Sequence, residues 1–75
     1  MYDGIEKKML EEMSRRLVAK KIELWEFAKK QKISKSAMDS VTKILVQKGM
    51  LTKIYASEST FAITQKGIRE ANRLE

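Results

Sequence analysis

One stretch decides the fold, residues 33–51, and its sequence is ISKSAMDSVTKILVQKGML. Apolar residues recur in it at intervals of three and four, the spacing of an amphipathic helix: Met38, Val41, Ile44 and Leu45. Either Ser34 or Ser36 is a suitable N-terminal cap, because a serine hydroxyl accepts a hydrogen bond from a free amide of the first turn. Gly49 is a suitable C-terminal stop, since glycine tolerates positive φ. The pattern predicts a helix from about residue 34 to about residue 48.

Two further helices are predicted before this stretch. Asp3 and Glu6 resemble a capping box, and they begin an amphipathic helix expected over about residues 3–20. Its apolar band consists of Ile5, Met9, Leu10, Met13, Leu17 and Val18. A shorter helix is expected over about residues 23–31, with Leu24, Phe27 and Ala28 buried. Ile33 then fills the turn between this second helix and the third.

The periodicity changes after the third helix. Residues 50–56 and 60–64 carry β-branched and aromatic side chains in loose alternation, joined by Ser-Glu-Ser, which predicts a two-stranded hairpin over about residues 50–64. Thr64 caps a last helix, expected over about residues 65–74 with Ile68, Ala71 and Leu74 on its apolar side. The predicted fold class is therefore α+β and mostly helical. It has a three-helix core, a hairpin and a C-terminal helix, all in one domain over residues 1–75.

Positive charge is concentrated in the middle of the chain. The 75 residues include 16 lysines and arginines against 10 acids, for a net charge of +6. Seven lysines and one acid, Asp39, lie between Lys29 and Lys53, so this segment carries the whole net charge. Such an excess favours a polyanionic partner. Lysine-rich surfaces are also typical of thermophile proteins, archaeal ones included, and this is the alternative explanation of the charge.

The sequence lacks most of the groups on which catalysis depends. It contains no cysteine and no histidine, which excludes disulfides, thiol nucleophiles, imidazole bases and the zinc sites built on these residues. Its acids alternate with lysines, and its three glycines form no phosphate-cradling loop. We therefore predict a binding protein without catalytic residues, metal or cofactor. Because it shows no long apolar stretch and no signal-peptide pattern, we expect it away from the membrane, in the cytoplasm with the nucleoid.

Three motifs in order resemble those of the winged helix-turn-helix family, in particular its small MarR-like regulators. Residues 26–28, Glu-Phe-Ala, followed by Ile-Ser at 33–34, are similar to the Glu-Leu-Ala…Ile-Ser signature of the first helix of the motif. The stretch 33–51 resembles the recognition helix with its Lys-Gly-apolar-apolar exit into the wing. Residues 63–67, Ile-Thr-Gln-Lys-Gly, resemble the Leu-Thr-x-x-Gly motif that ends the wing. The resemblance covers about residues 20–70 and implies a helix-turn-helix over about 23–48.

The resemblance implies a regulator that reads the major groove of double-stranded DNA with the third helix. The candidate DNA-binding residues lie on its outer face, at its start and on the wing: Lys32, Ser34, Lys35, Ser36, Asp39, Ser40, Lys43, Lys53 and Tyr55. This helix has no arginine, so the bidentate contact with guanine is missing and we expect modest sequence specificity. Glu58 at the wing tip would be repelled by phosphate, which predicts a wing that does not enter the minor groove. Tyr55 either contacts the DNA backbone or packs on the hairpin.

In similar regulators the terminal helices form a two-fold interface, and the wide apolar band of the first helix suggests a homodimer here. The candidate interface residues are Ile5, Met9, Met13, Trp25 and Leu74. The alternative is a monomer in which these residues close the core. Two other functions stay open, a winged-helix module that docks on a protein partner and a non-specific architectural DNA binder. The position of the charge favours DNA, whereas the missing arginine and the acidic wing tip favour protein.

Overall fold

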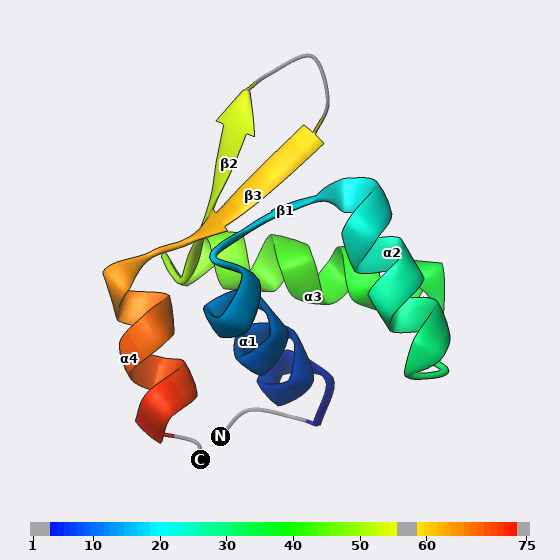
Figure 1. The fold of residues 1–75 in the computed structure, drawn as a ribbon, viewed down its shortest axis with the longest axis horizontal. Coiled ribbons are helices and arrows are strands. Elements are labelled where there is room, and N and C mark those ends of the chain that lie inside the picture. Colours follow the sequence, from blue (N-terminus) through cyan, green and yellow to red (C-terminus); the bar gives the residue numbers. More distant parts are fainter. Residues whose placement is uncertain (1–3, 56–58, 74–75) are drawn as a thin grey trace.

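Four helices and three strands make up the residues that the structure, a computed structural model, describes: 4–55 and 59–73 (Figure 1). In chain order they are α1 (Gly4–Arg16), β1 (Val18–Lys20), α2 (Lys21–Lys30), α3 (Lys35–Gln47), β2 (Leu51–Tyr55), β3 (Ser59–Ile63) and α4 (Gln65–Arg73). The predicted fold class is confirmed, with one added strand. None of these helices is both long and apolar enough to cross a membrane.

The added strand replaces the predicted end of the first helix. The helix was expected to reach residue 20, but it ends at Arg16, and Leu17 adopts a left-handed φ of 69°. The Leu17 carbonyl then accepts a hydrogen bond from the Ile63 amide at 3.0 Å, which starts the pairing of β1 with β3. Leu17 and Val18, expected in the apolar band, are about half exposed, at 52% each. Only Ala19 of the strand is buried.

The three strands form one antiparallel sheet in the order β1-β3-β2, so the hairpin is flanked by a third strand rather than standing alone. Phe61 lies opposite Ala19 on one side and opposite Lys53 on the other. Because paired residues share a face, these three side chains lie on the side of the sheet that meets the helices. The other face carries Val18 and Ile54, which are both exposed.

A single hydrophobic cluster joins all the helices to the sheet. It consists of Met9, Leu10, Met13, Ala19, Leu24, Ala28, Met38, Val41, Leu45, Met50, Leu51, Phe61 and Ala71. Met38, Val41 and Leu45 are buried as the helical spacing predicted. Met9 and Met13 are fully buried in the same cluster, so their side chains have no surface to offer a second chain. This corrects their assignment to a dimer interface.

The turn between α2 and α3 is built from local hydrogen bonds. The Ser34 side chain accepts a hydrogen bond from the Ala37 amide at 3.1 Å, which makes Ser34, and not Ser36, the N-terminal cap of α3. Lys32 takes a left-handed φ of 58° to turn the chain. The Ile33 amide then bonds the Ala28 carbonyl at 2.8 Å, and the Ile33 side chain packs against the core as predicted.

The two ends of the wing are joined at Thr64. Its hydroxyl donates a hydrogen bond to the Gly49 carbonyl at 2.7 Å and also lies 3.1 Å from the Met50 carbonyl, a second acceptor. The same hydroxyl oxygen accepts a hydrogen bond from the Gly67 amide at 3.1 Å. Gly67 packs so closely that a Cβ there would lie 2.3 Å from the Met50 carbonyl oxygen. Gly49 has a φ of 79°, as expected of a glycine stop. The Thr-x-x-Gly motif therefore holds α4 against the exit of α3.

Candidate nucleic-acid interface

The outer face of α3 is polar and accessible. Its buried side is formed by Met38, Val41, Thr42 and Leu45. On the opposite side Lys35, Ser36, Ser40 and Lys43 are exposed and Asp39 is half-buried. The structure therefore brings five of the predicted DNA-binding residues onto one helical face. Lys32 is exposed in the preceding turn, and the hydroxyl of Ser34 is engaged in capping the helix.

Trp25 connects this face to α2. Its indole Nε1 donates a hydrogen bond to Asp39 Oδ1 at 2.9 Å. The Lys35 ammonium lies 3.6 Å from the centroid of the indole ring, and the Lys21 ammonium lies 5.2 Å from it, both within cation–π range. Trp25 was predicted at a dimer interface, and that assignment stays a prediction; it is half-buried, and the contacts above join it to residues of its own chain. It is therefore part of the helix-turn-helix surface.

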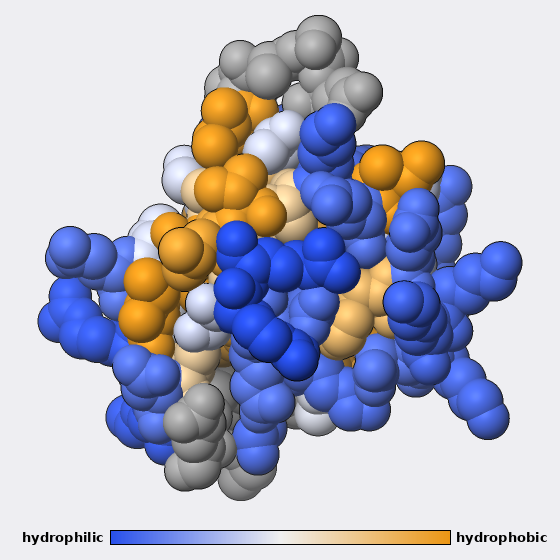
Figure 2. All heavy atoms as spheres, viewed as in Figure 1, coloured by the Kyte–Doolittle hydropathy of each residue, from blue (hydrophilic) through white to orange (hydrophobic). Residues whose placement is uncertain are grey.

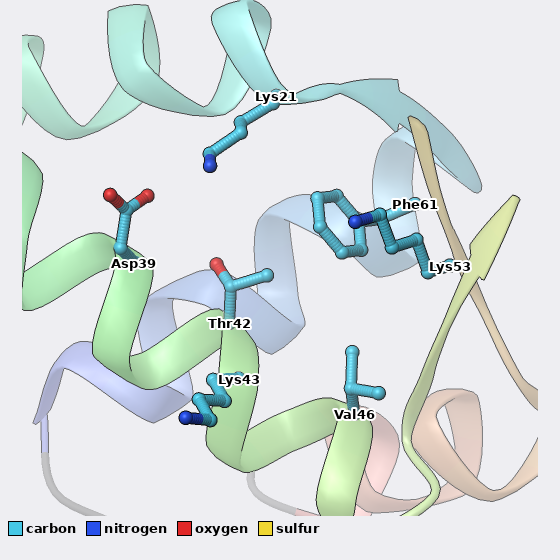
Figure 3. A pocket seen from close by; sticks show the side chains of 7 residues that line it. All are labelled: Lys21, Asp39, Thr42, Lys43, Val46, Lys53 and Phe61. Carbon is cyan, nitrogen blue, oxygen red and sulfur yellow. The ribbon is translucent and has the colours of Figure 1, made fainter. Parts of the chain in front are cut away.

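A hollow of about 350 Å³ lies between α3, the start of α2 and the wing (Figure 3). Its lining residues are Lys21, Asp39, Thr42, Lys43, Val46, Lys53 and Phe61. Figure 3 shows Lys21 reaching from α2 toward Asp39 on α3, with Lys53 and Phe61 on the wing side. Three lysines and one carboxylate make its rim positive. Sequence reasoning included Lys53 but missed Lys21, because only the fold brings the start of α2 beside α3.

The other predicted wing contact lies at the end of β2. Tyr55 is the last residue of β2. The wing tip, Ser57-Glu58, lies outside the described residues, and so the prediction that the tip stays out of the minor groove stays a prediction. Lys53 projects from the middle of β2 on the face that also holds Phe61.

The remaining interface candidates lie at the ends of the chain. Ile5 is half-buried and packs against the core, and Leu74 lies outside the described residues. Helices α1 and α4 pack side by side, and the first turn of α1 and the last turn of α4 lie at the same end of the molecule (Figure 1). Exposed apolar side chains occur elsewhere, at Leu17, Val18, Ile22 and Ile54. Figure 2 shows a hydrophobic band over the wing, in contrast to the hydrophilic surface of the helices below it.

The buried acids are held in ion pairs. Glu12 is only 8% exposed and pairs with Arg15 and with Arg16, whose Nε lies 2.6 Å from Glu12 Oε2. Glu6, also 8% exposed, pairs with Lys48. Among the residues described, no group of three or more acids could hold a metal ion. The Glu12 pairs therefore lie within α1, whereas the Glu6 pair ties α1 to the end of α3.

The sequence matches no known protein-family model and no curated protein. Solved structures do match. A double mutant of ZitR from Lactococcus lactis in apo form superposes with a TM-score of 0.76 at 18% identity, covering 93% of this chain and 53% of that one. The adhesin competence repressor AdcR from Streptococcus pyogenes superposes with a TM-score of 0.76 at 20% identity, covering 95% of this chain and 53% of that one. A second structure of the ZitR double mutant superposes with a TM-score of 0.77 at 17% identity, covering 97% of this chain and 50% of that one.

This chain therefore spans about half the length of the chains it resembles. At such identity the likeness concerns the backbone arrangement, since fold alone does not determine function. The helix-turn-helix of α2 and α3, the wing and the closing α4 all lie within the matched region. The chain has the winged helix-turn-helix fold of MarR-like proteins.

Proposed function

We propose that this protein binds double-stranded DNA as a regulator of transcription and places α3 in the major groove. The observation that carries the proposal is the outer face of α3, where Lys35, Ser36, Ser40 and Lys43 are exposed together. Hydroxyl and ammonium groups reach base edges and phosphates, and a helix of this length fits the major groove. The fold shared with a protein named as a repressor supports the regulatory role.

The lysines around the hollow extend this surface toward α2 and the wing. Lys21 at the start of α2 and Lys53 on the wing line one hollow beside α3 and are suited to contacts with backbone phosphates. Such contacts position the protein and provide most of its affinity, but they carry no sequence information. The absence of arginine from α3 limits direct readout. The proposed protein therefore binds many sequences and prefers some of them modestly.

The proposed functional unit is a homodimer in the cytoplasm, associated with the nucleoid. In this arrangement residues 1–75 act as one winged-helix unit, and α1 and α4 contribute the contact between two copies. Two-fold pairing would place two α3 helices about one turn of DNA apart, which matches a palindromic site. The proposal includes no catalytic step and no cofactor.

A salt series tests the DNA-binding function. Fluorescence anisotropy with random and genomic duplexes at several salt concentrations should give an affinity that falls steeply with salt. If about four to six phosphates are engaged, the log–log slope is roughly −4 to −5 per chain. A flat dependence, or no binding at low salt, would refute the DNA function. Equal affinity for every duplex would identify a non-specific architectural binder instead.

One observation favours a second function, docking on a protein partner. Leu17, Val18 and Ile54 are exposed by 40% or more, and Val18 and Ile54 lie on the same face of the sheet. Exposed apolar surface of this kind marks contact sites. Docking by this face leaves α3 accessible. DNA binding and docking are therefore compatible, but an absence of DNA binding at low salt would leave the apolar face as the main working surface.

A further inference from the structure

The acidic residue of α3 stands on the face that is otherwise basic and neutral. Asp39 is the single acid in the segment from Lys29 to Lys53, and it lies one helical turn from Lys35 and one from Lys43. A carboxylate on a surface that approaches phosphates costs affinity on every DNA sequence, because like charges repel. An affinity for DNA alone therefore does not explain an acid at this position.

The carboxylate is held in one orientation. Trp25 Nε1 donates to Asp39 Oδ1 at 2.9 Å, and the indole is itself packed under the Lys35 ammonium, 3.6 Å from the ring centroid. Asp39 Oδ2 takes part in no hydrogen bond or ion pair with the residues that the structure describes. Asp39 is half-buried and borders the hollow between α3 and the wing. One oxygen is thus anchored, while the other keeps its full capacity to accept hydrogen bonds.

An acceptor-only group in the major groove discriminates between bases. Cytosine presents its N4 amino group there as a donor, whereas guanine presents two acceptors and thymine presents an acceptor and a methyl group. A fixed carboxylate therefore gains a hydrogen bond from cytosine and meets lone pairs or a methyl group on guanine or thymine. Repulsion between the carboxylate and the acceptor atoms of guanine or thymine disfavours those bases, and such repulsion is an effective source of specificity.

We infer that Asp39 is the specificity-determining residue of α3 and selects cytosine at one position of the bound site through Oδ2. Trp25 is a positioning residue that holds the Asp39 carboxylate, and the surrounding lysines contact the backbone. This inference rests on the proposed function, since it requires α3 to lie in the major groove. It also assigns the sequence preference of the protein to a carboxylate, in a helix that has no arginine.

Selection of sites from a library of random duplex DNA tests the inference with the full chain. The wild-type protein should enrich cytosine at one fixed position of each half-site, by about five-fold or more over guanine or thymine in subsequent affinity measurements. Asp39→Asn is the decisive variant. Asparagine keeps an oxygen that can accept from Trp25, but it replaces the free acceptor with an amide donor. The cytosine preference should disappear, with adenine favoured instead, because asparagine pairs with the adenine edge.

Glu11→Gln on α1 is the matched control, because it removes the same charge from an exposed residue of another helix. It should leave the selected sequence unchanged. Trp25→Phe removes the anchoring donor and should reduce the cytosine preference to less than about half of its wild-type value. This variant is measured below its unfolding temperature, determined by circular dichroism, so that a weaker preference is not the result of unfolding.

The outcomes separate the two proposals. If the wild-type protein does not bind DNA at low salt, the proposed function and this inference both fail. If it binds, but Asp39→Asn tightens binding to all sequences by one common factor and selects the same sites, then Asp39 acts only through its charge and the inference fails while DNA binding stands. Loss of the cytosine preference in Asp39→Asn, but not in Glu11→Gln, supports the inference.

Discussion

Lys48 Nζ lies 3.2 Å from Glu6 Oε2, and this ion pair joins the first turn of α1 to the end of α3 across 42 positions of sequence. The Glu6 side chain is only 10% exposed, whereas that of Lys48 is 42% exposed. An acid this far buried depends on its partner more than a surface acid does.

Lys48→Met should therefore destabilise the protein by about 1–2 kcal/mol. The substitution removes the ammonium that pairs with the Glu6 carboxylate, whereas methionine keeps most of the aliphatic part of the lysine side chain. Urea unfolding followed by circular dichroism measures the change. The control is Lys7→Met, which breaks the exposed pair with Glu11 at 4.0 Å and should cost less than about 0.5 kcal/mol. Equal decreases in stability in the two variants would contradict the burial argument.

Gly67→Ala should be one of the most damaging single-methyl changes in the chain. The added Cβ would lie 2.3 Å from the Met50 carbonyl oxygen and 2.7 Å from the Ile63 side chain. Since the first of these is a backbone atom, α4 must shift, and we expect a decrease of about 2–3 kcal/mol in the free energy of unfolding. Gly4→Ala is the control, because nothing lies within 4 Å of the Cβ it would add. It should change stability by less than about 1 kcal/mol.

Replacing Lys35 and Lys43 with alanine should weaken binding to every DNA sequence and reduce the salt slope by about one for each phosphate that the variant no longer neutralises. Stability should fall by no more than about 1 kcal/mol, chiefly because Lys35 no longer lies over the Trp25 ring. Anisotropy titrations at several salt concentrations give both the affinity and the slope. Lys7 and Lys8, exposed on α1, are the charge-matched control pair. An equal decrease of affinity in the control would show that α3 is not the reading helix.

The proposed homodimer has a direct test in sedimentation equilibrium. At protein concentrations on the order of tens of micromolar the measured mass should be twice the 8.7 kDa of one chain. The contact should involve the accessible side chains of α1 and α4. It should not involve Met9 and Met13 of α1, whose side chains are fully buried. A mass of one chain at these concentrations would refute the dimer and leave each α3 to bind a half-site alone.

The parts of the fold that depend on local chemistry could be predicted from the sequence. A serine cap at Ser34 or Ser36, Gly49 as a stop and the Thr64–Gly67 motif act through neighbours a few residues away. The structure selects Ser34 as the cap and places the other two as expected. The predicted end of α1 was wrong, because Leu17 and Val18 continue the apolar spacing of the helix. What ends the helix is the pairing of β1 with β3, more than 40 residues further along the chain.

The sequence predicted which face of α3 is exposed, but it did not predict how the side chains of α2 and α3 contact one another. Helical spacing identified the exposed side of α3, since it follows from the positions of Met38, Val41 and Leu45. The hydrogen bond from Trp25 to Asp39 spans 14 residues and depends on how α2 crosses α3. The approach of Lys21 to the same hollow has the same origin. Helix crossings are set by packing, which the spacing of apolar residues does not specify.

The junction at Thr64 has a consequence for how this fold tolerates change. Its hydroxyl bonds the Gly49 carbonyl at the start of the wing while its own backbone ends the wing, so the two ends of that segment are held together independently of what lies between them. Residues inserted between β2 and β3 add only loop-closure entropy, roughly 0.6 kcal/mol for each doubling of loop length. The wing can therefore lengthen or acquire new side chains over evolutionary time without changing the positions of α3 and α4.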